Sequence, residues 1–278
     1  MHEILCSTGA MVGRPNGRNY RLLETCCPQL RCDGIEFILY NTWYDQVKEI
    51  TRYLKGLHLH IPVMHCEKTL SEHITRGGKE ELEEAFRLFR INCAMAEEIG
   101  ANRLVLHLWN GVISDSCMEN NLRAYPELKK ISEEYHLDLL VENVVCHIDP
   151  MTHWMELYRL YPDIHFVFDT KMAQFHRQME LLYSQEYAFL WKDGHIRHYH
   201  VNDHGGAYMD WNNLKVLPVG TGLIDFDRFF SFVHQTGYSG DFTLEATGFD
   251  AQGEVHIDLL NRQFDKVREY IWKTGGAI

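Results

Sequence analysis

Four apolar segments in the second half of the chain each end in a side chain that can bind a metal ion. Their inner residues are mostly Leu, Val, Phe or Tyr, and the last residue is a carboxylate or a histidine. Burying one carboxylate is costly unless it is paired or coordinated, so four such endings in succession are hard to explain by packing. The segments are Leu139-Leu140-Val141-Glu142, Phe166-Val167-Phe168-Asp169, His198-Tyr199-His200 and Phe242-Thr243-Leu244-Glu245.

Three carboxylates and one imidazole form a mostly oxygen donor set. This set suits Mn²⁺ best, and Mg²⁺, Co²⁺ and Zn²⁺ also fit it. A single strand-end Glu is more often salt-bridged, and a single core His is usually only hydrogen-bonded. The conjunction of four favours a site, so we predict that one divalent ion is bound by Glu142, Asp169, His200 and Glu245.

Short apolar runs alternate with longer amphipathic stretches along the whole chain. The clearest stretch is Lys79–Ile99, whose apolar residues recur at helical spacing, and Gly100 follows where a left-handed C-terminal cap is expected. Further helices are expected over 118–135, 225–233 and 256–272. The apolar runs, which predict strands, are 3–7, 34–39, 57–65, 103–109, 138–144, 164–170, 196–203 and 241–246.

Continuous apolar strands that alternate with helices indicate a parallel sheet covered on both faces. Eight such units fit a single (β/α)₈ TIM barrel better than an open doubly wound sheet, and no GxGxxG segment follows an early strand. We therefore expect one barrel domain over residues 1–278. Its active site should lie at the C-terminal ends of the strands, where the four ligands can converge.

Charge and composition limit the kinds of molecule that the chain is expected to bind. The net charge of −12 opposes binding to nucleic acid, since phosphate contacts need a basic surface. The eight cysteines form no CxxC pair, which is typical of a reduced interior, and no apolar run approaches the length needed to span a membrane. No signal-peptide pattern opens the chain. We expect a cytoplasmic protein that takes a small molecule, with a homo-oligomer as an open alternative.

The chain resembles the xylose-isomerase-like TIM barrels, the sugar (phosphate) isomerase/epimerase group that is related to AP endonuclease family 2. Each motif is short, and their order and spacing carry the resemblance over essentially the whole chain. The motifs are Asp33-Gly34-Ile35-Glu36, Val141-Glu142-Asn143, Phe168-Asp169-Thr170-Lys171, His198-Tyr199-His200-Val201-Asn202-Asp203, Pro218-Val219-Gly220-Thr221-Gly222, Ile224-Asp225-Phe226 and Leu244-Glu245.

The resemblance implies a metal-dependent isomerase or epimerase of a sugar or sugar derivative. In the mechanism that it implies, Glu142 and Glu245 each bind the metal with one oxygen and exchange a proton with the other. One removes a proton next to the substrate carbonyl and the second returns it, through a metal-stabilised enediolate. Asp169 and His200 are then ligands only.

Departures from two branches of the family limit what can be carried over. The DNA-repair branch is matched at His65 and His107, but it needs a His three residues after the strand-six Asp, where Met172 stands. It also needs an Asp-x-His pair where this chain reads 213–217, so AP endonuclease activity is the least favoured function. The ketose 3-epimerase branch also has a His three residues after the strand-six Asp, at the position of Met172. It further has an Arg a few residues after the strand-seven His, where this chain has Gly205-Gly206. Its substrate therefore cannot be transferred.

Six further side chains are substrate-binding candidates by their position: His65, His107, Trp109, Lys171, Asp203 and His204. Lys171 shares the strand parity of Asp169 and either replaces a missing polar group or only neutralises the carboxylates. His58 and His60 have the opposite parity to His65 and are interpreted as structural. The segment 205–221 is either a lid or an ordinary loop. Gly220-Thr221-Gly222 either binds phosphate or is structural.

Two other functions remain open. The same metal site could serve a lyase or dehydratase acting on an inosose or keto-sugar, because the first step, α-proton removal, is the same. A barrel that only binds a ligand is disfavoured by the retention of all four ligand types.

Overall fold

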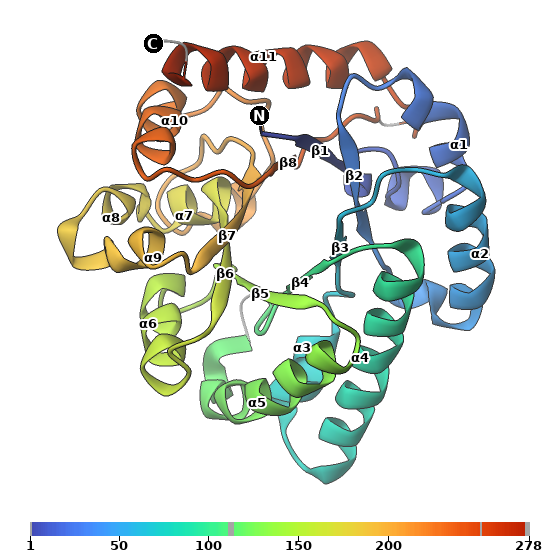
Figure 1. Ribbon diagram of the computed structural model, residues 1–278, viewed down its shortest axis with the longest axis vertical. Coiled ribbons are helices and arrows are strands. Elements are labelled where there is room, and N and C mark those ends of the chain that lie inside the picture. Colours follow the sequence, from blue (N-terminus) through green and yellow to red (C-terminus); the bar gives the residue numbers. More distant parts are fainter. Residues whose placement is uncertain (1, 111–113, 251, 276–278) are drawn as a thin grey trace. The chain divides into compact units, whose positions relative to one another are not determined.

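The computed structural model describes residues 2–110, 114–250 and 252–275. Eight parallel strands follow one another around a closed barrel in the order β1 to β8, as the alternation of apolar runs and helices predicts (Figure 1). The strands are β1 (Ile4–Ser7), β2 (Gly34–Ile38), β3 (Val63–His65), β4 (Arg103–Leu106), β5 (Asp138–Glu142), β6 (His165–Asp169), β7 (Ile196–Val201) and β8 (Phe242–Leu244).

Helices fill the segments between the strands, and the last helix follows β8. They are α1 (Leu22–Cys26), α2 (Val47–Leu57), α3 (Leu70–Arg76), α4 (Lys79–Ile99), α5 (Met118–Glu134), α6 (Pro150–Leu160), α7 (Thr170–Phe175), α8 (Met179–Leu182), α9 (Phe189–Lys192), α10 (Phe226–Gln235) and α11 (Ile257–Gly275). In the part of the chain that the structure describes, no helix combines the length and the apolar character that a membrane span requires.

The chain divides into two compact units, which are described separately. The first comprises Met1–Ile35 and Asp169–Ile278, and the second comprises Glu36–Phe168. The expectation of one domain over 1–278 stays a prediction, and its residues 1, 111–113, 251 and 276–278 lie outside the described residues.

In the second unit, β3, β4 and β5 pair side by side, with His65 opposite Val105 and Leu106 opposite Val141. Helix α4 has the bounds that the sequence predicts and ends at Gly100, whose φ of 86° is the expected left-handed cap. Asp149 caps the start of helix α6, because its side chain accepts the Thr152 N–H at 2.7 Å.

An aromatic cluster fixes β7 and β8 in the first unit. Tyr199 of β7 stacks on Phe242 of β8 at 5.6 Å between ring centroids, and Phe229 and Phe230 of α10 pack against this pair. All four rings are buried. The register sets His200 opposite Thr243, so that the ends of the two strands lie level.

The predicted strand 57–65 is wrong in its first half. Leu57 completes α2, His58 caps that helix with a φ of 52°, and β3 begins only at Val63, after Pro62. Proline lacks the N–H that an inner ladder position needs, which explains the late start. His58 and His60 are exposed and lie outside the strand, so their predicted position facing helices from within it is wrong.

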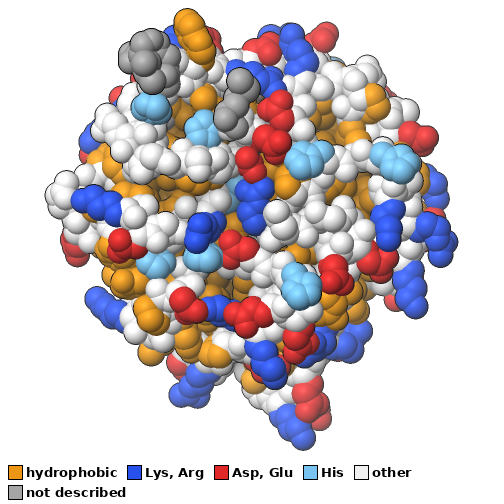
Figure 2. All heavy atoms as spheres, in the orientation of Figure 1, with side chains coloured by type: hydrophobic (Ala, Val, Ile, Leu, Met, Phe, Trp, Pro, Cys, Tyr) orange, Lys and Arg blue, Asp and Glu red, His pale blue; other side chains and the backbone are white. Residues whose placement is uncertain are grey.

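The visible surface has acidic and basic side chains interspersed, with histidines among them (Figure 2). The large apolar side chains that are exposed among the described residues are Ile148, Leu160, Tyr208, Leu223 and Trp272. Single exposed apolar residues of this kind are normal on a protein surface and identify no partner.

Candidate active site

The four predicted metal ligands fall into the two units. Glu142 ends β5 in the second unit, whereas Asp169, His200 and Glu245 belong to the first. Glu142, Asp169 and His200 are at most 1% exposed, and the side chain of Glu245 is 13% exposed. Glu142 has hydrogen-bond and ion-pair partners in the second unit, and Asp169, His200 and Glu245 have theirs in the first.

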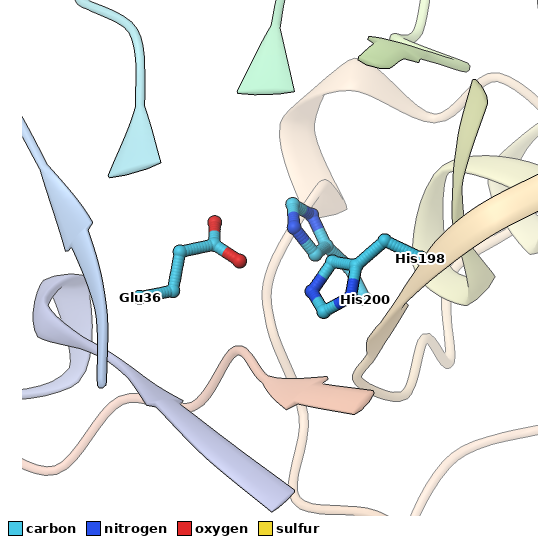
Figure 3. Close-up of side chains that lie close together, drawn as sticks. All are labelled: Glu36, His198 and His200. Carbon is cyan, nitrogen blue, oxygen red and sulfur yellow. The ribbon is translucent and has the colours of Figure 1, made fainter. Parts of the chain in front are cut away.

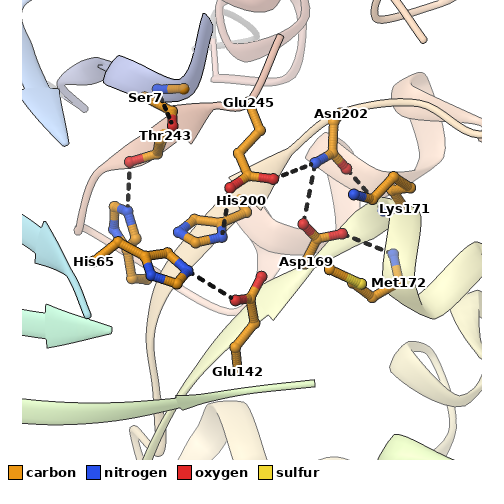
Figure 4. A network of polar contacts seen from close by, with 12 residues as sticks. Ser7, His65, Glu142, Asp169, Lys171, Met172, His200, Asn202, Thr243 and Glu245 are labelled. Carbon is orange, nitrogen blue, oxygen red and sulfur yellow. Dashed lines mark hydrogen bonds and ion pairs between the residues drawn. The ribbon is translucent and has the colours of Figure 1, made fainter. Parts of the chain in front are cut away.

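Two imidazoles hold Glu142 in the second unit. Its Oε2 atom lies 2.6 Å from His107 Nε2 and 3.4 Å from His65 Nε2, and Figure 4 shows the His65 contact. The two rings meet edge to face at 4.8 Å. Ligand atoms of all three side chains lie within 4.8 Å of one another, so the group could hold a cation or share a proton.

The tautomer of His65 follows from its other contact. Its Nδ1 lies 2.8 Å from the carbonyl oxygen of Cys66, which can only accept, so Nδ1 carries the proton. In the neutral ring Nε2 then points a lone pair toward the carboxylate. Burial lowers the pKa of His107 to about 4, against the opposing charge of Glu142, so His107 is neutral at pH 7.

Asn202 joins two predicted ligands in the first unit. Its side-chain amide donates to Asp169 Oδ2 at 3.0 Å and to Glu245 Oε2 at 3.1 Å, as Figure 4 shows. Its Oδ1 accepts the backbone N–H of Lys171 at 2.9 Å, and its own backbone is hydrogen-bonded to the Thr170 hydroxyl. Asn202 is fully buried, so these bonds fix both carboxylates in orientation.

Asp169 also caps the start of α7. Its Oδ1 accepts the Met172 N–H at 2.7 Å and caps the helix. His200 is fully buried, with Nδ1 3.8 Å from Glu245 Oε1. The structure therefore brings Asp169 and His200 into one polar cluster with Glu245, through Asn202 and the His200 contact.

His198 supports His200 from the same side of β7, and Figure 3 shows both rings on that side. The His198 ring contacts that of His200 at 5.5 Å, and its Nε2 lies 2.8 Å from the Thr243 hydroxyl. Figure 3 also shows Glu36 on β2, a fully buried carboxylate of the other unit. In the sequence, Glu36 stands out only as the last residue of the Asp33-Gly34-Ile35-Glu36 motif.

Lys171 and His204 form a second polar pair in the first unit. Both are buried, and burial together with the nearby Lys171 charge lowers the pKa of His204. Neither ring nitrogen of His204 makes a hydrogen bond of normal geometry to any described residue. Both residues were predicted as substrate contacts, which stays a prediction.

Asp203 is a loop-closing residue in this structure. Its Oδ1 accepts the N–H groups of His204 and Ile224, and its Oδ2 accepts those of Gly220 and Gly222, at 2.8–3.2 Å. A Cβ at Gly222 would lie 2.4 Å from the carboxylate, so only glycine fits there. Because these N–H groups donate to Asp203, the structural interpretation of Gly220-Thr221-Gly222 is favoured over phosphate binding.

Trp109 is a buried packing residue. It is fully buried and donates its indole N–H to the Val144 carbonyl at 2.7 Å. The loop 205–221 is anchored, because Met209 N–H donates to the Phe175 carbonyl and the Trp211 ring packs on Phe175 at 5.0 Å. This arrangement favours an ordered loop over a lid.

Residues 28–262 match the family model described as "Xylose isomerase-like TIM barrel". The chain belongs to this family. It is an enzyme family, so membership agrees with a catalytic role for the site. No curated protein has a matching sequence.

Solved structures agree in fold. An L-ribulose 3-epimerase is 13% identical with a TM-score of 0.70, over 99% of this chain and 96% of the other. A D-tagatose 3-epimerase-like protein is 16% identical with a TM-score of 0.69, over 99% and 98%. The IolI protein with a bound zinc atom is 15% identical with a TM-score of 0.71, over 98% and 99%. At these identities the likeness concerns the fold.

Proposed function

We propose that the chain is a metal-dependent isomerase or epimerase of a sugar or sugar derivative, with Glu142, Asp169, His200 and Glu245 as ligands of one divalent ion. The observation that carries the proposal is the Asn202 amide, which holds the carboxyl groups of Asp169 and Glu245 together next to His200. Family membership and the ends of β5 to β8 in a closed barrel support the inclusion of Glu142.

The donor chemistry fits a hard divalent cation. Carboxylate oxygens and one imidazole favour Mn²⁺, although the related fold of the zinc-bound IolI protein makes Zn²⁺ the natural competitor. When bound, such an ion supplies a Lewis acid that polarises a substrate carbonyl and its neighbouring hydroxyl.

The protein groups supply the proton transfers. Glu142 takes the proton from the carbon next to the carbonyl, with His107 2.6 Å away to share it. Glu245, which must enter this step protonated, gives its proton to the other side of the enediolate and becomes a carboxylate, and Asn202 keeps its carboxyl group in position. Burial of these groups excludes water from the reacting carbon. A cytoplasmic location and a carbohydrate partner belong to the same proposal.

A substrate screen with added Mn²⁺ tests the reaction, and an Asp169→Asn variant tests the site. We expect isomerised or epimerised sugar of unchanged mass, and about one equivalent less bound metal in the variant than in the parent chain. Products that have lost water would instead identify a dehydratase. Equal metal content in both proteins would exclude the proposed ligand set.

A further inference from the structure

A second group of potential ligands lies in the second unit, away from the residues proposed above. Asp115 follows β4, Cys146 follows β5, and His153 belongs to α6. One ligand atom of each lies within 4.8 Å of the other two, and all three side chains are buried. The donors are an oxygen, a sulfur and a nitrogen, a combination that zinc accepts in proteins.

The outer partner of His153 orients its ring. Both ring nitrogens face carboxylates, so a neutral ring donates to only one of them. In the tautomer that suits a metal site, Nδ1, 3.2 Å from Glu156 Oε2, donates to Glu156. Nε2 then carries the lone pair, and it lies 3.3 Å from Asp115 Oδ2, which also has only lone pairs to offer. Two facing acceptors repel unless a proton or a cation lies between them. A carboxylate behind the far nitrogen of a histidine is a common arrangement at metal sites.

The spacing of two of the three donors, the His153 nitrogen and the Asp115 oxygen, agrees with a tetrahedral ion. Zinc bonds of about 2.0–2.1 Å to nitrogen and oxygen set these atoms about 3.3–3.4 Å apart at the tetrahedral angle. The distance between His153 Nε2 and Asp115 Oδ2 is 3.3 Å. Asp115 is itself held by the backbone N–H groups of His147 and Ile148, at 3.1 and 2.7 Å, so its carboxylate is fixed before any ion binds.

We propose that Asp115, Cys146 and His153 bind a zinc ion that is separate from the proposed catalytic metal. Binding forms one bond from the ion to each of the three donors, and the Cys146 thiol releases its proton to solvent. A water molecule would complete four-coordination. The alternative is a protonated His153 that donates to both carboxylates, with no ion bound.

The site would connect two loops at the carboxyl ends of β4 and β5. The His153 ring contacts the Trp109 ring edge to face at 5.2 Å, and Trp109 donates to the Val144 carbonyl two residues beyond Glu142. A bound ion would therefore stiffen the contact between Trp109 and Val144, close in the chain to Glu142. We assign it a structural role, since neither Cys146 nor His153 contacts Glu142 in any described interaction.

Cobalt distinguishes the two sites, because only a cysteine ligand produces a thiolate-to-cobalt charge-transfer band in the near ultraviolet. We expect metal-free wild-type protein to develop this band as Co²⁺ is added, and Zn²⁺ to remove it. The band should be lost in Cys146→Ser. It should persist in Asp169→Asn, whose proposed site has no sulfur, so failure here and failure of the proposed catalytic site give different results.

Cys93→Ser is the matched control, because Cys93 is another buried cysteine of the same unit, in α4. It should keep the band. Circular dichroism checks that each variant is folded, and His153→Gln, which should weaken the band at equal Co²⁺, replaces Cys146→Ser if that variant unfolds. Absence of the band in the wild type, or an undiminished band in folded Cys146→Ser, would overturn the proposal.

Discussion

The two proposed proton-transfer glutamates are held by different chemistry. Glu142 faces the imidazoles of His107 and His65, at 2.6 and 3.4 Å. Glu245 accepts an amide N–H from Asn202 at 3.1 Å. An imidazole can accept a proton and pass it on, whereas the amide NH2 group that faces Glu245 can only donate a hydrogen bond. The comparison predicts that Glu142 can pass a proton on to His107, whereas Asn202 offers Glu245 no proton acceptor.

The largest expected effect comes from removing either carboxylate. Glu142→Gln and Glu245→Gln should each lower turnover by about 10²–10⁴-fold, the usual loss for a missing general base. Saturating Mn²⁺ should not restore it, because Gln still offers an oxygen to the metal but cannot accept a proton. Steady-state rates at rising Mn²⁺ measure this, and full recovery would make the two residues ligands only.

Hydrogen exchange at the reacting carbon then separates the two glutamates. In Glu245→Gln, Glu142 should still remove the substrate proton and wash it into solvent without product forming. In Glu142→Gln, washout from the same carbon should be absent. Identical washout in the two variants would contradict the different roles proposed for Glu142 and Glu245.

Asn202→Ala should have the next largest effect. It removes the N–H donors from both Asp169 and Glu245, and loss of such outer partners typically weakens metal affinity by about 10–100-fold. Metal titration of the purified protein measures this independently of activity. Asn92→Ala is a control, since Asn92 is also fully buried but binds Tyr44 and the Glu67 backbone in the other unit. The metal affinity of the Asn92→Ala variant should equal that of the parent chain.

His107→Phe should have a smaller effect on turnover, about tenfold, because Glu142 keeps its carboxylate but loses its nearest proton acceptor. Solvent exchange of the Glu142 proton should slow relative to turnover, so more substrate hydrogen should be retained in the product. His65→Phe provides the comparison, since His65 lies farther from Glu142. An equal rise in retained hydrogen in both variants would argue against a specific role of His107.

The smallest expected effect concerns His204. This ring lies near the positive charge of Lys171, whereas the His107 ring lies near the carboxylate of Glu142. Burial and Lys171 lower the pKa of His204, so the unfolded chain binds a proton at a higher pH than the native state does. The contribution to stability is therefore present above the unfolded pKa of about 6.5 and is lost as the pH falls below it. Lys171→Met should raise the pKa of His204, as an NMR titration of the ring would measure. An unchanged or lowered value would contradict the proposed proximity.

The alternation of apolar runs and helical stretches was sufficient to predict the barrel and the C-terminal cap at Gly100. The strand ends led to the four proposed ligands, which stay a prediction. The strand ends were not sufficient for the partners of those ligands. Asn202 has the same strand parity as His200, and nothing in its sequence position shows that one amide reaches two carboxylates from β6 and the end of β8. That depends on side-chain rotamers and on the register that sets His200 opposite Thr243.

Two other differences have equally local causes. The substrate-binding role of Asp203 stays a prediction, but the sequence did not indicate that four backbone N–H groups from residues 204–224 donate to its carboxylate. His58 lies in an apolar run that predicts a strand, but the run includes the end of α2. Periodicity over a few residues cannot distinguish a helix end from a strand start when both are apolar.

The four bonds to Asp203 have a consequence for protein engineering. They close the segment 205–221 at its base, and the bridge between Asp203 and Leu217 closes it a second time. Its tip, around Tyr208 and Asp210, could therefore be exchanged for a segment from another member of the family without altering β7. If Asp203, Leu217, Gly220 and Gly222 are kept, such chimeras would test whether this segment influences the selectivity of the proposed site.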